Sequence, residues 1–299
     1  MFHVKHDLLC TVEQVFCVQE VAKNSRLCYD CRANLSALNS ARKKEGVMGK
    51  IIAVVNQKGG VGKTTSAVNL TAALNALGVR VLLCDFDPQA NATSGLGVEK
   101  RNVSLGTYEM IIDEAAPERC VVKTKFGDVI PSTSALAGAT VELIGLENRE
   151  YRLKSQLDRL RDAYDYILID CPPSLELLTL NALCAADSIL IPVQCEYYAL
   201  EGLSDLMSTL RAIKKRLNPR LEIFGVLLTM YDGRTNFSNQ VAQEVRRHFP
   251  GKVFASVIPR NVRLAEAPSH GVPVIAYDRS SRGAAAYLAV AEEFNRKGR

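Results

Sequence analysis

The stretch that decides the fold reads AVVNQKGGVGKTTSAVNL and runs from Ala53 to Leu70. It begins with apolar, β-branched residues that predict a buried strand, and residues 64–77, which come next, have the composition of a helix. Between the two elements lie Gly59, Gly60 and Gly62. Glycine lets backbone N–H groups turn inward around an anion, and the positive end of the following helix adds to the attraction. We therefore expect a phosphate-binding loop at this junction.

The loop departs from the strict phosphate-loop pattern, G-x-x-x-x-G-K-[ST]. That pattern requires glycine at position 57, where the chain has Gln57. The chemistry is retained, because Lys63 is placed to reach the β- and γ-phosphates of a nucleotide and the Thr64 hydroxyl to bind Mg²⁺. The position between strand and helix, and the Lys-Thr-Thr that ends the motif, favour this interpretation over a glycine loop without a ligand. A second lysine, Lys58, precedes the glycines, although one lysine is enough for an ordinary loop of this kind.

Three carboxylates follow other predicted strands. Asp85 and Asp87, in VLLCDFDPQANATSGLG, leave the second strand, where a carboxylate can orient a water molecule or the water shell of Mg²⁺. Asp170, in YDYILIDCPPS, ends an apolar strand and matches the carboxylate that holds Mg²⁺ through water in sites of this class. Cys171 beside it has no histidine nearby in the sequence, so we interpret it as a small buried residue.

Short β-rich segments alternate with helical ones from Met48 onward. Strands that are apolar nearly throughout, with helices between them, are typical of a mostly parallel sheet covered on both faces. The predicted fold is therefore α/β, a doubly wound sheet whose ligands bind at the carboxyl ends of the strands. The predicted strands are Ile51–Val55, Arg80–Cys84, Asp128–Ile130, Tyr166–Ile169, Ser188–Val193, Ile223–Leu228 and Val253–Val257. The predicted helices are Thr64–Leu77, Arg149–Asp162, Leu177–Ala185, Leu200–Leu217 and Ser238–Phe249.

Residues 1–47 differ in composition from the rest of the chain. Cys28-Tyr-Asp-Cys31 has the spacing of half a zinc site, but no second CxxC or HxxxH comes after it. The codons of MFHVKH can be chosen as a perfect inverted repeat, so we hypothesise that the segment is translated upstream DNA that includes a palindromic protein-binding site. Met48 then opens MGKIIAVVNQ, a natural start for a domain that begins with a strand. We expect an N-terminal extension over 1–47, disordered or arising from a mis-assigned start, and the nucleotide-binding domain over 48–299.

Composition limits the class of protein. The chain has 299 residues, of which 47% are hydrophobic and 23% charged, so it can bury a full core. Its net charge of +5 is mild, so any nucleic-acid surface must be a local patch. The nine cysteines are scattered, as in a protein of the reducing cytoplasm. No apolar run approaches the roughly 20 residues of a membrane span, and no secretory signal pattern opens the chain.

Six sequence blocks, in order from Met48 to the C-terminus, together resemble one family. They are KGGVGKTT, DFDPQANATSGLG, IDCPPS, PVQCEYYALEG, TMYDGRTN and VIPRNVRLAEAPSHG. The blocks closely resemble the ParA/Soj partitioning ATPases, P-loop NTPases of the deviant Walker A type that are related to MinD. The resemblance implies a ParA-type ATPase domain over 48–299 that slowly hydrolyses ATP to ADP and phosphate with Mg²⁺, and faster with a partner.

The resemblance further implies a dimerisation switch. ATP would join two subunits into a homodimer that binds double-stranded DNA without sequence preference. Hydrolysis, stimulated by a ParB/Spo0J-type centromere-binding protein, would release the dimer and so drive partitioning of a chromosome or plasmid. Such a protein would be cytoplasmic and associated with the nucleoid rather than with a membrane.

The resemblance also implies roles for individual residues. Lys58 matches the signature lysine of the family, which crosses the dimer interface to touch the phosphates bound by the other subunit. Two facing ATP molecules concentrate negative charge, which an extra cation from each subunit offsets. Asp87 would position the attacking water with support from Asp85, and Asp170 and Thr64 would serve Mg²⁺. The implied nucleotide-binding residues are Lys58, Gly59, Gly60, Val61, Gly62, Lys63, Thr64, Thr65 and, lining the adenine, Pro259 and Asn261. The later strands are not followed by an N-K-x-D guanine reader, which favours ATP over GTP.

Two arginines are candidates for DNA binding. Arg234 in DGRTN and Arg263 in PRNVR match family positions that bind DNA without sequence preference. The sequence has no motif that reads base edges, which agrees with contacts to phosphates alone. Other basic residues nearby are consistent with a DNA-binding surface and equally with a solvated helix face. They are Lys214, Lys215, Arg216, Arg220, Arg246 and Arg247.

Three alternatives stay open. A MinD-like membrane ATPase needs a C-terminal amphipathic helix with a basic face, whereas AAAYLAVAEEFNRKGR has adjacent Glu292 and Glu293 and is typical of a helix packed on its own domain. A DNA-binding scaffold with structural ATP would not need both Asp87 and Asp170. An iron–sulfur carrier needs paired cysteines at a dimer seam, whereas those after Met48 are scattered: Cys84, Cys120, Cys171, Cys184 and Cys195.

Overall fold

Seven strands form one sheet with the order β3-β4-β2-β5-β1-β6-β7. A computed structural model describes residues 48–196 and 199–298, and this part of the chain forms a unit of its own. All neighbouring strands are parallel except β3, which runs antiparallel to β4 at the edge. The strands are β1 (Lys50–Val54), β2 (Val81–Asp85), β3 (Val122–Thr124), β4 (Gly127–Ile130), β5 (Tyr166–Asp170), β6 (Ser188–Gln194) and β7 (Glu222–Thr229).

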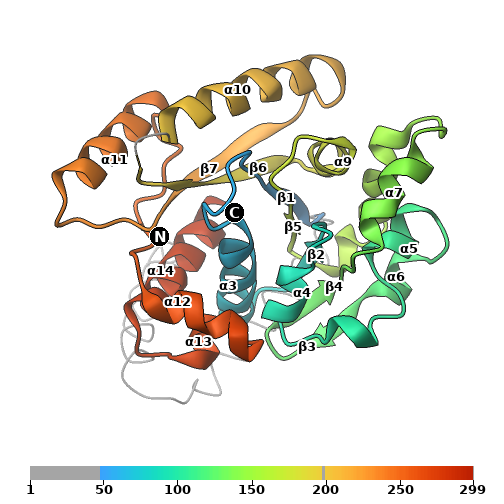
Figure 1. The fold of residues 1–299 in the computed structure, drawn as a ribbon, viewed down its shortest axis with the longest axis horizontal. Helices are drawn as coiled ribbons and strands as arrows, with labels where there is room; N and C mark the ends of the chain where they lie inside the picture. Colours follow the sequence, from blue (N-terminus) through green and yellow to red (C-terminus); the bar gives the residue numbers. More distant parts are fainter. Residues whose placement is uncertain (1–47, 197–198, 299) are drawn as a thin grey trace, which may run out of the picture. The chain divides into compact units, whose positions relative to one another are not determined.

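Helices connect the strands and cover the sheet (Figure 1). The longer ones are α3 (Lys63–Ala76), α7 (Leu136–Leu143), α9 (Leu177–Ala185), α10 (Ala199–Arg216), α11 (Asn236–His248) and α14 (Arg282–Lys297). The shorter ones are α4 (Asn91–Gly95), α5 (Thr107–Ile111), α6 (Pro117–Cys120), α8 (Arg152–Asp158), α12 (Val262–Glu266) and α13 (Val274–Tyr277). The 3₁₀ turns in the described ranges are η1 (Lys100–Asn102), η2 (Arg149–Tyr151), η3 (Arg161–Ala163) and η4 (Ala267–His270).

The sheet has a hydrophobic core on each face, because successive residues of a strand point to opposite sides. In β1, Ile51 and Ala53 belong to the core that α8, α9 and α10 cover, whereas Ile52 and Val54 belong to the core that α3 and α14 cover. All four of these side chains are fully buried. The structure thus confirms the predicted doubly wound α/β fold.

The predicted strand over Val253–Val257 is wrong. Only Val253 forms a bridge, to Val226 of β7. The Phe254 N–H still donates to the Val226 carbonyl at 2.9 Å. The two N–H groups after it, those of Ala255 and Ser256, donate instead to the Glu293 carboxylate of α14 at 2.9 and 3.0 Å. A side chain on a distant helix therefore takes the hydrogen bonds that a strand would give to its neighbour.

The predicted helix over Arg149–Asp162 is interrupted, and α8 forms only its middle part. The cause is Asn181 of α9. Its side-chain oxygen accepts from the Leu153 N–H at 3.1 Å, and its side-chain nitrogen donates to the Arg149 carbonyl at 2.9 Å. These two bonds separate the 3₁₀ turn at 149–151 from α8. The three-residue strand β3, too short to carry a pattern, was not predicted.

The C-terminal helix α14 packs along α3, as the sequence predicts for a helix that covers its own domain. Its buried residues include Tyr287 and Phe294, and the Tyr287 hydroxyl lies 3.1 Å from that of Ser66 in α3. None of the helices in the described ranges is long and apolar enough to cross a bilayer.

Replacing Glu293 by alanine tests the anchor between α14 and residues 255–256. The change leaves two partly buried N–H groups without a partner, and a hydrogen bond to a charged group contributes about 1.5–3 kcal/mol. We expect urea denaturation to show a free energy of unfolding lower by about 3 kcal/mol. Glu292→Ala, at the exposed neighbouring position, is the matched control and should change it by less than about 0.5 kcal/mol. Equal effects of the two variants would contradict the anchor.

Candidate functional site

The glycine-rich loop is held at both ends by neighbouring strands. Asn56, directly after β1, donates from its side chain to the Pro192 carbonyl of β6 at 2.8 Å and accepts from the Lys58 N–H at 3.0 Å. The Thr229 hydroxyl at the end of β7 donates to the Val61 carbonyl at 2.8 Å. Gly62, which precedes α3, has a φ of 89°, a conformation that favours glycine. The loop is thus fixed in a curled form at the start of α3.

Lys63 is buried although it carries a charge. Its side chain is folded back, and the ammonium donates to the Lys58 carbonyl at 3.1 Å. Burial lowers the pKa of Lys63, and the nearby Asp170 carboxylate partly opposes that effect. A cation placed inside a loop of backbone N–H groups at a helix N-terminus is suited to binding an anion of high charge.

Asp85 and Asp170 lie side by side, because they are paired residues at the carboxyl ends of β2 and β5. Both are fully buried. Burial, followed by the charge of Asp85, raises the pKa of Asp170 far above its usual range. Neither oxygen of Asp170 accepts a hydrogen bond of normal geometry from a described residue. The Thr64 hydroxyl is nevertheless close enough to oppose part of the increase in the pKa of Asp170.

A buried carboxylate without hydrogen-bond partners is costly unless a cation accompanies it. Asp170, with the Thr64 hydroxyl close to it, offers the oxygen ligands that Mg²⁺ prefers. The residues present therefore fit a magnesium ion, which Asp170 and Thr64 would hold beside the loop.

Asp87 is placed by a network that begins at Asp85. One oxygen of Asp85 accepts from the Thr93 N–H and hydroxyl, at 2.7 and 2.6 Å, and the other accepts from the Asp87 N–H at 3.3 Å. The Thr93 hydroxyl in turn accepts from the Ser132 N–H at 2.8 Å. Asp87 itself is half-buried, and its carboxylate accepts from the Gln89 N–H at 2.9 Å. Thr93 and Ser132 were not predicted from the sequence, since ordinary hydroxyl residues carry no signal of such a role.

Lys58 lies at the surface end of the loop and forms a loose ion pair. Its ammonium is 3.7 Å from one oxygen of Glu196, just after β6, and about a third of its side chain is exposed. Arg260 lies 3.7 Å from the other oxygen of Glu196. Glu196 was not predicted from the sequence, although it stands in the block PVQCEYYALEG that carries the resemblance.

The residues predicted to line the adenine lie beside the end of β7. Pro259 forms a bridge with Tyr231, which comes shortly after β7. Asn261 caps the short helix α12, because its side-chain oxygen accepts from the Arg263 N–H at 2.9 Å. The side-chain oxygen is thus occupied, and the side-chain nitrogen of Asn261 is the group available for a contact with adenine.

The two predicted DNA arginines differ in their surroundings. Arg234 is 90% exposed, and its guanidinium is held on one edge by the Asp232 carboxylate through two bonds of 2.9 Å. This contact lowers the pKa of Asp232 to about 2. Arg263 is about half exposed and lies between two carboxylates, Glu266 at 2.8 Å and Asp278 at 3.2 Å.

The other basic residues considered for DNA lie on exposed surfaces at or near the ends of helices. Lys214, Lys215 and Arg216 form the last turn of α10, and Arg246 and Arg247 belong to the last turn of α11. Arg220 lies in the exposed connection to β7. Their positions agree with both interpretations of these residues, a DNA surface and a solvated face.

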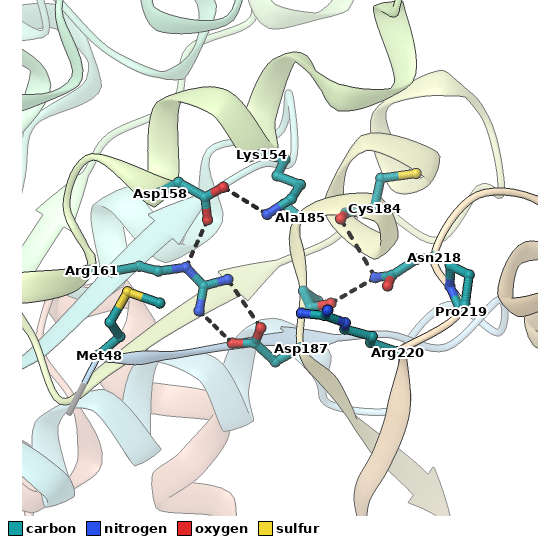
Figure 2. Close-up of a pocket in the computed structure, with 11 residues that line it drawn as sticks. Met48, Lys154, Asp158, Arg161, Cys184, Ala185, Asp187, Asn218, Pro219 and Arg220 are labelled. Carbon is teal, nitrogen blue, oxygen red and sulfur yellow. Dashed lines mark hydrogen bonds and ion pairs between the residues drawn. The ribbon is translucent and has the colours of Figure 1, made fainter. Parts of the chain in front are cut away.

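A cavity of about 610 Å³ lies away from all of the predicted catalytic and nucleotide-binding residues, at the amino ends of β1, β6 and β7 (Figure 2). Its charged groups are largely paired with each other. Arg161 donates to Asp187 at 2.8 and 3.0 Å and to Asp158 at 2.7 Å, and Lys154 donates to Asp158 at 2.6 Å. Asp187 also accepts from the Ile51 N–H at 2.8 Å, so this cluster fixes the start of the central strands.

The cysteines after Met48 are buried, which confirms the interpretation of Cys171 as a small core residue. Burial raises the pKa of the Cys84 and Cys171 thiols well above the usual range. Within the ranges that the structure describes, no three histidine, cysteine or acidic residues are grouped as metal ligands. The pair Cys28 and Cys31 lies outside the described residues.

Comparisons with known proteins give the site its context. A family model described as an AAA domain matches residues 49–223. The chain is 58% identical over 253 residues to the sporulation initiation inhibitor protein Soj of Bacillus subtilis, covering 84% of this chain and all of Soj. It is 52% identical to the chromosome partitioning protein ParA of Myxococcus xanthus, over 84% of this chain and 89% of ParA.

Among solved structures, the fold matches cobyrinic acid a,c-diamide synthase of Mycobacterium smegmatis with a bound ATP analogue and magnesium. The TM-score is 0.75 and the identity 37%, over 83% of this chain and 94% of that one. The chain is thus more similar in sequence to Soj and ParA than to this synthase.

Replacing Asp85 by asparagine should stabilise the nucleotide-free protein at high pH. Burial raises the pKa of Asp85 from 3.8 to about 6. Because the folded pKa exceeds the unfolded one, burying the ionised group costs stability above about pH 6 and costs nothing below about pH 4. The shift corresponds to about 3 kcal/mol, and it already includes the hydrogen bonds from Thr93 and Asp87, which favour the ionised form.

We therefore expect Asp85→Asn to raise the free energy of unfolding by about 3 kcal/mol at pH 8 and by less than about 1 kcal/mol at pH 4. Urea denaturation in EDTA, without nucleotide, measures both values. A variant that loses stability equally at the two pH values would show that the hydrogen bonds of Asp85 outweigh its charge.

Proposed function

Because the chain belongs to the Soj/ParA family of chromosome-partitioning ATPases, we propose that ATP joins two copies of it into a dimer. The dimer binds DNA without sequence preference, and hydrolysis of the ATP separates the copies. A ParB/Spo0J-type protein accelerates hydrolysis and so directs the movement of the chromosome. The protein acts in the cytoplasm, on the nucleoid.

The contrast between the two lysines of the loop carries this proposal. Lys63 is buried and directed back into its own loop, where it would hold the β- and γ-phosphates. Lys58 stands at the surface, where its ammonium forms a 3.7 Å pair with Glu196. A cation that is exposed at the mouth of a phosphate site is free to reach a phosphate in a facing subunit, and such a contact makes the nucleotide part of the interface.

ATP and Mg²⁺ fit the buried groups of the site. The loop from Lys58 to Thr65, with Gly59, Gly60, Val61, Gly62 and Thr64, would surround the phosphates, and Asp170 and Thr64 would hold the ion. When bound, Mg²⁺ supplies positive charge to the phosphates. Pro259 and the side-chain nitrogen of Asn261 would line the adenine site beside β7.

Asp87 is the residue that would orient the attacking water. It is half-buried and follows the strand whose end faces the loop, and Asp85 supports it through the Asp87 N–H. Asp85 is a positioning residue in this proposal, since its carboxylate is already occupied by Thr93.

DNA binding is assigned chiefly to Arg234. Its guanidinium is oriented by Asp232 and its remaining N–H groups face solvent, which suits a phosphate contact. Arg263 contributes less in this arrangement, because Glu266 and Asp278 already surround it. In a dimer each arginine is present twice, so the DNA surface is doubled.

A membrane-associated ATPase of the MinD type is the second candidate. It needs a C-terminal helix free to lie in the bilayer surface. Here Tyr287, Val290 and Phe294 of α14 are buried in the core shared with α3. Releasing α14 would expose these side chains, which favours the DNA-binding proposal.

Replacing Lys58 by alanine tests the proposed switch. The variant should bind a non-hydrolysable ATP analogue normally, because Lys63 remains, but should dimerise more than about 100-fold more weakly. Two charge-assisted contacts of about 1.5–3 kcal/mol each are lost from the dimer. Light scattering with the analogue and Mg²⁺ measures the dimer, and nucleotide fluorescence measures binding.

Two further variants serve as controls for this test. Lys63→Ala should lose nucleotide binding itself, and Asp87→Ala should keep the ATP-dependent dimer while losing turnover. A Lys58→Ala protein that dimerises like the wild type would refute the assignment of Lys58.

The assignment of the DNA surface is tested by Arg234→Ala and Arg263→Ala. In ATP-bound dimers, Arg234→Ala should weaken DNA binding and lower the slope of log K against log salt by about 2, one phosphate contact for each subunit. Arg263→Ala should have the smaller effect, and Arg119→Ala, on α6, should have none. Electrophoretic mobility shift at two salt concentrations measures this. If Arg234→Ala retained the affinity of the wild type, the DNA surface would have to lie elsewhere.

A further inference from the structure

The end of α7 exposes a group of large apolar side chains. Val141, Ile144 and Leu146 are 72%, 60% and 43% exposed and lie within six residues of one another. Other exposed large apolar residues in the described part of the chain stand apart from this group in the sequence. We call these three residues the α7 ridge. Apolar residues concentrated on one surface mark a place where another molecule binds.

The ridge is a consequence of how α7 is packed. Leu136, Ala139 and Leu143 form the buried face of the helix, within the core that also contains α5. Val141 and Ile144 therefore point away from the domain. In Figure 1, α7 lies at the edge of the molecule, beside α5.

Acidic groups outnumber basic ones in the ridge segment, whereas the chain as a whole is basic. Glu142 and Glu147 are exposed within and beside the ridge. The Glu142 carboxylate accepts from the Tyr108 hydroxyl at 2.7 Å, and Glu147 forms no ion pair with any described residue. The nearest cation in sequence, Arg149, donates to the Ile144 carbonyl of the ridge at 2.9 Å and is paired with Glu150 at 3.1 Å. An apolar ridge flanked by exposed carboxylates is complementary to a segment that has apolar and basic residues.

The ridge is connected to the residues of the proposed reaction. Four residues before α7, the Ser132 N–H donates to the Thr93 hydroxyl, which donates to Asp85. Asp85 accepts from the Asp87 N–H. The segment that leads into α7 is thus joined by three consecutive hydrogen bonds to the loop that carries Asp87, and a ligand that shifts α7 acts on that loop.

We propose that the α7 ridge is the docking surface for a short, basic, amphipathic segment of the ParB/Spo0J-type partner. The inference rests on the proposed function and adds to it the surface through which the partner acts. A second copy of this chain is the competing occupant, and the experiment separates the two.

The double variant Val141→Ser, Ile144→Ser tests the ridge in the full chain. The probe is the ParB/Spo0J-type protein of the same organism, titrated into the ATPase with ATP, Mg²⁺ and DNA. We expect the partner concentration for half-maximal stimulation to rise at least about tenfold, with the basal rate within about twofold of the wild type. Ile144→Leu, which keeps the apolar surface, should behave like the wild type.

Glu147→Lys tests the charge of the surface. It should raise the half-maximal partner concentration several-fold, whereas Glu292→Lys, on the exposed side of α14, should leave it unchanged. Both substitutions replace one exposed negative charge by a positive one. A difference between their half-maximal partner concentrations therefore reports where the charge lies and not the net charge of the protein.

Three outcomes would overturn the proposal. Unchanged stimulation of the double variant would place the partner elsewhere. Loss of the ATP-dependent dimer in the double variant, measured by light scattering, would make the ridge an interface between two copies of this chain. If the wild type itself were not stimulated by the partner, the partner assignment in the proposed function would fail, and the ridge proposal with it.

Discussion

The arrangement of the site depends on charge buried at the carboxyl ends of two adjacent strands. Asp85 and Asp170 are paired across β2 and β5, and Lys63 in the first turn of α3 is a buried cation close to them. When both carboxylates are ionised, they outnumber the one buried ammonium and leave a negative charge that water does not screen, and the raised pKa values of Asp85 and Asp170 express this cost. Asp170 in particular has no hydrogen-bond partner of normal geometry among the described residues. A bound cation would neutralise this charge. The phosphate loop lies beside the two carboxylates, so the cation would bind together with the phosphates of a nucleotide.

The sequence predicted the parts of this site that depend on local pattern. A strand, a glycine-rich turn and a helix fixed the place of Lys63 and Thr64, and apolar runs that end in aspartate fixed Asp85 and Asp170 at one edge of the sheet. The doubly wound fold could be predicted from the same runs. The predictions that failed depended on contacts between distant segments: Glu293 takes the hydrogen bonds of the expected strand at 253–257, and Asn181 interrupts the expected helix at 149–162.

The same limit explains why Thr93, Ser132 and Glu196 were missed. Each is an ordinary polar residue whose importance comes only from its partner in space. Thr93 joins Asp85 to the segment before α7, and Glu196 lies between Lys58 and Arg260. The surroundings of Arg234 and Arg263, the two arginines proposed to bind DNA, could not be predicted for the same reason. Their sequence contexts look equivalent, yet one guanidinium is exposed and oriented while the other is enclosed by two carboxylates.

The carboxyl end of β7 brings the proposed nucleotide and DNA surfaces together. Thr229 binds the Val61 carbonyl of the phosphate loop, and Arg234, five residues later, is the exposed arginine. Between them, Met230 adopts a φ of 50°, which is unusual for a residue with a side chain, and the Tyr231 N–H donates to the Ile258 carbonyl at 2.9 Å. The phosphate loop and Arg234 are therefore connected by one short, hydrogen-bonded segment. An ATP-dependent change in DNA binding needs no longer path than this, because the strand end that holds the loop also carries the arginine.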